Sequence, residues 1–209
     1  MAYTVRNIIV GAAELYVSSS DSTASGWGTG PSVPAGTANV KLKAAMDAST
    51  DFRGIGFTTD GLNLSYEPDY ADIVVDQLLD SARLFKRALK VLITSNLTEA
   101  TLENLLVAWG QNTSVLSSTT TDKTMNLAGG SLGDEPIERT LVALGPGPKG
   151  SSGIKTERLY HARRVLSVST SAFAVKRSDV TMFPVSFRLL PDPSFSGAEY
   201  GIIKDRILS

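Results

Sequence analysis

Helical periodicity occurs at one place in this chain, and this constrains the fold more than any other feature. Around residues 98–109 the apolar side chains recur at the i, i+3, i+4, i+7 spacing of a single helix face: Leu102, Leu105, Leu106 and Trp109. Elsewhere the apolar residues come in short or alternating runs, separated by turns rich in Gly, Pro and Ser. Parallel sheets need helical crossovers, so we expect a mainly β fold, an antiparallel β-sandwich or barrel with one flanking α-helix.

The boundaries of the expected elements follow from the same patterns. Asn96 and Glu99 resemble a capping box ahead of the helix, and Gly110 is placed to end it. Residues 40–46 form a short segment whose type stays open. Apolar runs and alternation predict strands at residues 4–17, 55–58, 61–66, 73–79, 83–95, 137–144, 157–169, 172–177, 181–190 and 200–207.

A long polar loop follows the first expected strand. Residues 18–38 are rich in Ser, Gly, Thr and Pro and have little apolar surface to bury. Loops of this length in a compact domain are usually functional or disordered, so we expect residues 18–52, the N-terminal loop, to be mobile in a free subunit. Trp27 either anchors this loop to its own domain or contacts a neighbouring subunit, because Trp is favoured at interface centres.

Composition excludes several classes of protein. The chain of 209 residues is 42% apolar and 20% charged, which predicts one globular domain over residues 1–209. Cysteine is absent, and this removes disulfides, iron–sulfur clusters and thiol nucleophiles. The first residues lack the pattern of a secretory signal, and no apolar run is long enough to cross a membrane as a helix. We expect neither a cofactor nor a metal.

The residue types that carry catalysis do not form a recognisable active site. His161 is the single histidine, and it lies on an expected strand without a nucleophile motif. Gly145 and Gly150 have the spacing of a phosphate-binding loop, but Ser151 stands where that motif requires lysine. We therefore interpret residues 145–153 as a turn and expect a protein that is not an enzyme.

Acidic residues gather before position 82. Asp72, Asp76 and Asp80 are evenly spaced, and carboxylate clusters can bind divalent cations or cleave glycosides. On a strand, however, residues four apart are separated by about 13 Å, which is too far for one metal ion. We interpret these residues as an acidic solvated face.

The charges are divided unequally along the chain, although the net charge is only −1. Residues 1–82 hold 10 acidic and 4 basic residues, whereas residues 83–209 hold 11 acidic and 16 basic ones. If residues 73–79 and 83–95 pair as a hairpin, some charges meet within one subunit, and the surplus can join subunits. The interface residues expected on this basis, together with Trp27 from the N-terminal loop, are Asp72, Asp76, Asp80, Arg83 and Arg87.

Several short motifs, in order, resemble those of one protein family. Residues 54–68 read Gly-Ile-Gly-Phe-Thr-Thr-Asp-Gly-Leu-Asn-Leu-Ser-Tyr-Glu-Pro, and the helix reads Leu-Thr-Glu-Ala-Thr-Leu-Glu-Asn-Leu-Leu-Val-Ala-Trp-Gly. Towards the C-terminus come Glu157-Arg158, Lys176-Arg177-Ser178-Asp179, Phe183-Pro184-Val185-Ser186-Phe187 and Leu190-Pro191-Asp192. This order resembles the major tail (tail tube) proteins of long-tailed, non-contractile bacteriophages, above all forms from phages of actinobacteria. The resemblance covers residues 5–17 and 54–207, and no single motif is diagnostic.

The resemblance implies a structural virion protein, made in the host cytoplasm and located in the phage tail. Six subunits would form a ring, and stacked rings would form a hollow tube that conducts the genome without specific DNA binding. Its partners would be further copies of itself and the tail tip, tape measure and tail terminator proteins. The N-terminal loop matches the position of a loop that reaches the adjacent ring in such proteins. Residues 202–207 depart from the pattern.

Other functions stay open at this point. The inner tube of a contractile tail or of a secretion machine has a similar fold. A non-viral β-sandwich binding module, such as a lectin, would need exposed aromatic residues near Asp or Asn in loops, where Trp27 alone qualifies. A glycosidase would have to use Asp72 and Asp76.

Overall fold

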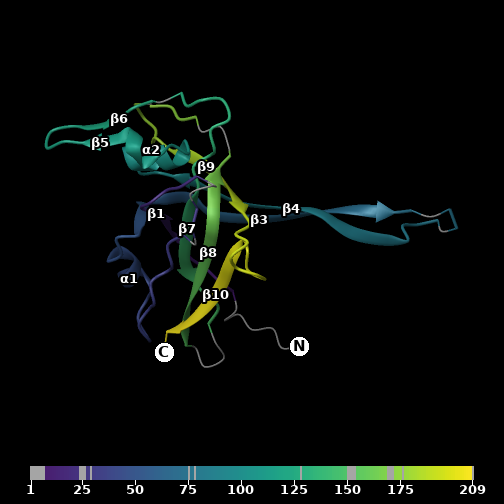
Figure 1. Ribbon diagram of the computed structural model, residues 1–209. Coiled ribbons are helices and arrows are strands. Elements are labelled where there is room, and N and C mark those ends of the chain that lie inside the picture. Colours follow the sequence, from purple (N-terminus) through teal and green to yellow (C-terminus); the bar gives the residue numbers. More distant parts are fainter. Residues whose placement is uncertain are drawn as a thin grey trace.

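The computed structural model describes residues 8–23, 27–28, 30–74, 76–77, 79–127, 129–149, 154–168, 172–175 and 177–208. Strands dominate and helices are short (Figure 1). The elements in chain order are β1 (Glu14–Ser18), α1 (Lys43–Asp47), β2 (Phe52–Gly56), β3 (Thr58–Ile73), β4 (Arg83–Leu97), α2 (Leu102–Ala108), η2 (Thr113–Val115), β5 (Leu116–Ser118), β6 (Lys123–Met125), β7 (Arg139–Pro146), β8 (Lys155–Ser167), β9 (Phe183–Leu190) and β10 (Gly201–Leu208).

Eight strands form one antiparallel sheet, so the expected mainly β, antiparallel fold is confirmed. The order is β2-β1-β7-β8-β9-β4-β3, and β10 also pairs with β8. The long strand β8 divides its free edge between two partners. Residues 155–162 pair with β10, whereas residues 164–167 pair with β9. The sheet therefore splits along β8, and its two branches enclose apolar space in the manner of a sandwich.

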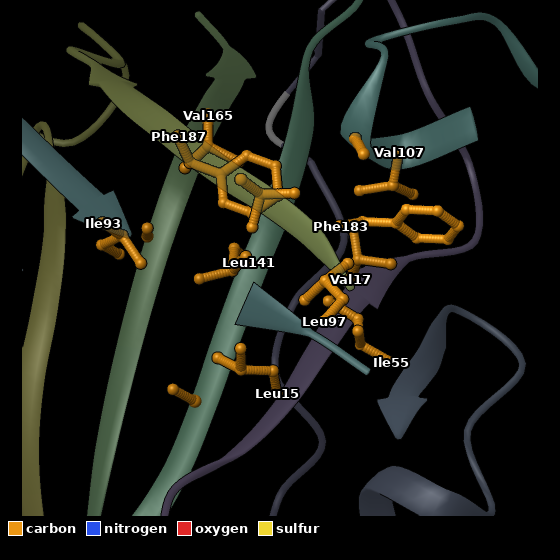
Figure 2. Packing of buried hydrophobic residues seen from close by; sticks show 14 of the residues in the cluster. Leu15, Val17, Ile55, Ile93, Leu97, Val107, Leu141, Val165, Phe183 and Phe187 are labelled. Carbon is orange, nitrogen blue, oxygen red and sulfur yellow. The ribbon is translucent and has the colours of Figure 1, made fainter. Parts of the chain in front are cut away.

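The main core lies on one face of the sheet, where the alternation of side chains gathers apolar residues (Figure 2). In β9 the alternate residues Phe183, Val185, Phe187 and Leu189 are buried, whereas Pro184 and Arg188, which point to the other face, are exposed. Residues from six other elements fill the same core, and Figure 2 labels Leu15, Val17, Ile55, Ile93, Leu97, Val107, Leu141 and Val165 among them.

Helix α2 covers one end of this core, but its boundaries differ from the expectation. Thr101 is the N-cap, and its Oγ1 accepts a hydrogen bond from the Asn104 amide at 3.2 Å. The expected capping box at Asn96 and Glu99 is wrong because Asn96 still belongs to β4. Gly110 ends the helix as expected: its φ of 62° is left-handed, a conformation that glycine adopts without strain.

The buried face of α2 is also rotated from the one that the periodicity predicts. Leu106 is buried as expected, together with Asn104, Val107 and Ala108. Leu102, Leu105 and Trp109 are only half-buried. The difference arises because Asn104 points inward, where its amide nitrogen donates to the carbonyl oxygens of Ile55 and Glu99.

The N-terminal loop is attached to the body at several points. Leu42 and Met46 are almost fully buried in a second apolar cluster, beside Tyr16 of β1 and Leu159 of β8. Residues 43–47 form helix α1, so the structure has a second helix where the segment type was left open. The C-terminal part of the N-terminal loop, beyond the polar residues 18–38, is therefore packed against the sheet, and the mobility of the loop in a free subunit stays a prediction.

Strands β3 and β4 form a long hairpin, and this corrects the expected strand at residues 73–79. Strand β3 continues through Pro68 to Ile73, and the chain then turns back, with the Ala82 amide bonded to the Ile73 carbonyl oxygen at 2.8 Å. Pro68 is tolerated because β3 is an edge strand, where a missing N–H breaks no ladder. Residues 75 and 78 lie outside the described part.

The remaining boundaries shift by a few residues or change type. Residues 139–146, 155–167, 183–190 and 201–208 confirm four expected strands. The strand expected at 4–17 is present only from Glu14, and residues 1–7 are not described. The strand expected at 172–177 is absent from residues 172–175, where Phe173 instead packs edge-on against Phe183. No helix of the described chain is long and apolar enough to cross a membrane.

Candidate assembly interface

Strands β3 and β4 run on past the body as a projecting arm, defined here as residues 66–91 (Figure 1). The burial of β4 marks its root, because burial alternates from Val91 onward whereas residues 83–88 are all exposed. The strand from Tyr66 to Ile73 is about 23 Å long at the usual rise per residue. The arm therefore places its tip far from the core.

Large apolar side chains cover the arm and remain open to solvent. The exposed fractions are 61% for Tyr66, 55% for Tyr70, 60% for Leu84 and 47% for Phe85. A two-stranded ribbon without a third layer is marginally stable, and several large apolar side chains left exposed on one such element favour its role as an interaction surface. The arm is the first element of the candidate interface. The sequence analysis expected a hairpin here but paired residues 73–79 with 83–95, whereas the first strand of the arm is the continuation of β3 to Ile73.

Charges along the arm are largely matched inside it. The Arg87 guanidinium donates two hydrogen bonds to the Asp69 carboxylate, at 2.7 and 3.0 Å. Lys90 lies 3.6 Å from Glu67, whose carboxyl pKa is lowered by the Ser65 hydroxyl and by Lys90. Arg87, expected to contact another subunit, thus has its carboxylate partner in its own hairpin.

The tip of the arm keeps an excess of acid. Asp72 and Asp80 bond only to Ser81 among the described residues, through its hydroxyl at 3.1 Å and its amide at 2.7 Å. Asp76 lies exposed in the turn. Arg83 stands opposite Ile73 in the register and has no carboxylate partner in the described part of the chain. The structure thus brings the three predicted aspartates to one end of one arm, but not to one metal-sized cluster.

Strand β10 provides a second exposed surface. One edge pairs with β8, and the other faces no strand among the described residues. Gly201 lets β10 begin against β8: a Cβ at this residue, whose φ is 139°, would lie 2.0 Å from the His161 carbonyl oxygen. Ile203 and Ile207 are 58% and 67% exposed. An open edge with exposed isoleucines is a template for pairing with another chain.

An apolar groove lies between the root of the arm and β10. It has a volume of about 180 Å³ and receives residues from both branches of the sheet, among them Leu64, Val91, His161, Leu189 and Ile202. These residues come from five strands. No local sequence pattern marks such a groove, because only the split of the sheet brings its walls together.

His161 lies in the wall of this groove. The side chain is 7% exposed, and its Nε2 has no hydrogen-bond partner. Burial, and then the nearby Arg163 charge, lower the pKa of the imidazole to about 4. His161 is therefore neutral at pH 7, which agrees with neither a surface histidine nor a satisfied one.

Trp27 packs within its own subunit. Its ring is half-buried, 5.7 Å from the Arg164 guanidinium, and its Nε1 is buried without a partner. Arg164 is in turn fixed by two hydrogen bonds to the buried Glu138. Of the two readings of Trp27, this packing favours the anchor to its own domain, and a contact with a neighbouring subunit stays a prediction.

The structure also bears on two further candidates from the sequence, the glycine-rich segment at residues 145–153 and a metal site. Gly145 and Pro146 still belong to strand β7, which corrects the start of the turn expected at residues 145–153, and residues 147–149 begin the connection to β8. Gly150 and Ser151 lie outside the described residues. Within the described ranges no three His, Asp or Glu side chains are grouped as a metal site would need.

No protein-family model matches this sequence, and a search of the curated proteins finds no match.

Proposed function

We propose that this protein is a structural subunit that assembles into hexameric rings, which stack into a hollow tube. The observation that carries the proposal is the arm of residues 66–91, a two-stranded ribbon that leaves the body with its apolar side chains exposed. A monomer gains nothing from such a ribbon, whereas an assembly can cover it and be held together by it.

Three other features support assembly from identical copies. Strand β10 has an open edge with exposed isoleucines, the groove beside it is apolar, and unmatched acids concentrate at the tip of the arm. These surfaces differ from one another, so contact between copies would be heterologous. Heterologous contacts generate rings when the rotation closes and helical filaments when it does not.

The resemblance of the sequence motifs supports a location in the virion, where this assembly would be the tail tube of a long-tailed bacteriophage. The tube would conduct DNA without binding it specifically. Its partners would be the tail tip, tape measure and tail terminator proteins. The proposal includes no catalytic activity.

Negative-stain electron microscopy of the concentrated full chain tests the proposal. We expect rings or hollow tubes, and sedimentation at rising concentration should show species larger than the monomer. A strictly monomeric protein up to millimolar concentration would contradict it. A glycan-binding module or a glycosidase would instead give monomers that bind or cleave an oligosaccharide.

A further inference from the structure

A cleft lined by lysines lies where β7 ends and β8 begins. It has a volume of about 390 Å³, and its wall includes the backbone of Gly145–Gly147 and the last described residue of β10, Leu208. Four lysines line this cleft, which we call the lysine cleft: Lys41, Lys43, Lys149 and Lys155.

The acids of the cleft are already engaged. Glu14 lies 2.9 Å from Lys43. Glu157 is buried, 2.8 Å from Arg206, and accepts a hydrogen bond from the Leu42 amide. The other three lysines are exposed and have no ion-pair partner among the described residues: Lys41, Lys149 and Lys155. The cleft is therefore a positively charged hollow that favours an anionic group.

The tip of the arm has the complementary character. Asp72, Asp76 and Asp80 are exposed and unmatched by any lysine or arginine in the described chain. Asp69 and Glu67, nearer the body, are matched by Arg87 and Lys90. Once the internal ion pairs of the described residues are assigned, three unmatched acids remain at the tip of the arm and three unmatched lysines remain in the cleft.

The two surfaces cannot meet within one chain. Figure 1 shows the arm projecting sideways from the body, whereas the cleft lies beside the C-terminal end of β10. The cleft of one copy can receive the tip of another, and the second copy keeps its own cleft free. The contact is heterologous, so it can repeat from copy to copy.

We infer that the acidic tip of the arm, with Asp72, Asp76 and Asp80, docks into the lysine cleft of a second copy, at Lys41, Lys149 and Lys155. The inference rests on the proposed function, because it names the contact through which copies assemble. Lysine ammonium groups carry three donors each on flexible stems, so they can adapt to carboxylates on a turn.

Charge reversal on each side provides the test. The tip variant is Asp76→Lys with Asp80→Lys, and the cleft variant is Lys149→Glu with Lys155→Glu. At low ionic strength we expect each variant alone to associate at least about tenfold more weakly than the parent, because like charges would face one another. An equimolar mixture should associate again, since each variant's reversed surface then meets its complement on the other.

A matched control makes the same two Asp→Lys changes at aspartates outside the arm. Asp122→Lys with Asp134→Lys alters two exposed aspartates outside the arm and should associate like the parent. The inference is overturned if the tip variant behaves like this control, or if the mixture of tip and cleft variants associates no better than each alone.

Cross-linking separates the inference from the tube proposal. The chain has no cysteine, so Gln77→Cys at the tip and Leu208→Cys in the cleft can be joined selectively by a short bis-maleimide, with every charge retained. We expect a heterodimer from the mixed variants, and none when Ser118→Cys replaces Leu208→Cys. If the protein forms tubes but this cross-link does not form, the docking of the tip is wrong and the tube proposal stands. If the cross-link forms but no rings or tubes appear, the tube proposal is wrong and the docking of the tip stands.

Nucleic acid is the competing occupant of the lysine cleft. A short DNA duplex should compete poorly with the tip in the cross-linking reaction at physiological salt. If the duplex blocks the cross-link, and its binding is lost in the cleft variant, the cleft is a phosphate site and the docking of the tip is overturned.

Discussion

Arg139 and Asp21 form an ion pair of 2.7 Å between side chains that are only 5% and 6% exposed. Arg139 begins β7, and Asp21 belongs to the N-terminal loop, so the pair fastens this loop to the sheet. Each partner is satisfied further: Arg139 donates to the Gln111 carbonyl oxygen, and Asp21 accepts from the Thr113 amide. The bonds surround both charges and hold three chain segments together.

Removing one member of this pair should destabilise the fold strongly. Asp21→Ala leaves the Arg139 charge buried without its partner, and such losses cost about 3–5 kcal/mol. Asp69→Ala is the matched control, because its ion pair with Arg87 has the same length but lies in solvent, where pairs contribute about 0–1 kcal/mol. Denaturant unfolding gives both free energies. Equal losses in the two variants would contradict the anchoring role of Asp21.

Two neighbouring leucines of α2 differ in how deeply they are buried. Leu106 is 2% exposed, so Leu106→Ala should lower the free energy of unfolding by about 2–5 kcal/mol. Leu105 is half-buried, and Leu105→Ala should cost roughly half as much or less. The periodicity alone treats the two residues alike. A larger loss at Leu105 than at Leu106 would mean that the helix packs by its other face.

His161 should make the stability depend on pH. Its pKa is about 4 in the folded chain and about 6.5 when unfolded, so the unfolded state binds the proton more readily between these values. Stability should therefore fall as the pH drops from 6.5 towards 4, by roughly 3 kcal/mol in all. As the only histidine, His161 gives one imidazole signal to titrate by NMR. His161→Phe should remove this part of the pH dependence, and a folded-state pKa near 6.5 would refute it.

The sequence predicts those parts of the fold that depend on residues close together in the chain, and it does not predict those that depend on contacts between distant segments. The strands of the core can be predicted from the sequence, because alternate residues such as Phe183, Val185 and Phe187 are apolar and face one buried layer. The arm is less visible, since Pro68 fits an extended strand only where the outer edge is unpaired. The groove at His161 and the lysine cleft are assembled from distant strands, so no spacing in the sequence indicates them. The sequence shows the acidic cluster but predicts its basic partners at Arg83 and Arg87, which follow it directly, whereas the partner that we infer is the lysine cleft.

The apolar side chains of the arm should matter for assembly and not for the fold of the subunit. Leu84 and Phe85 are exposed, so Leu84→Ser with Phe85→Ser should change the free energy of unfolding by less than about 0.5 kcal/mol. In an assembly that covers Leu84 and Phe85, each side chain would contribute part of the roughly 1.5–3 kcal/mol that a fully buried apolar side chain contributes. Losing both contributions should weaken association at least about tenfold. Leu127→Ser with Leu132→Ser is the control, because these leucines are also exposed but lie outside the arm. Sedimentation and microscopy at matched concentrations compare the variants. If the arm variant forms rings or tubes at the parent's concentration, its apolar surface has no part in assembly, and the case for the arm as an assembly element is lost.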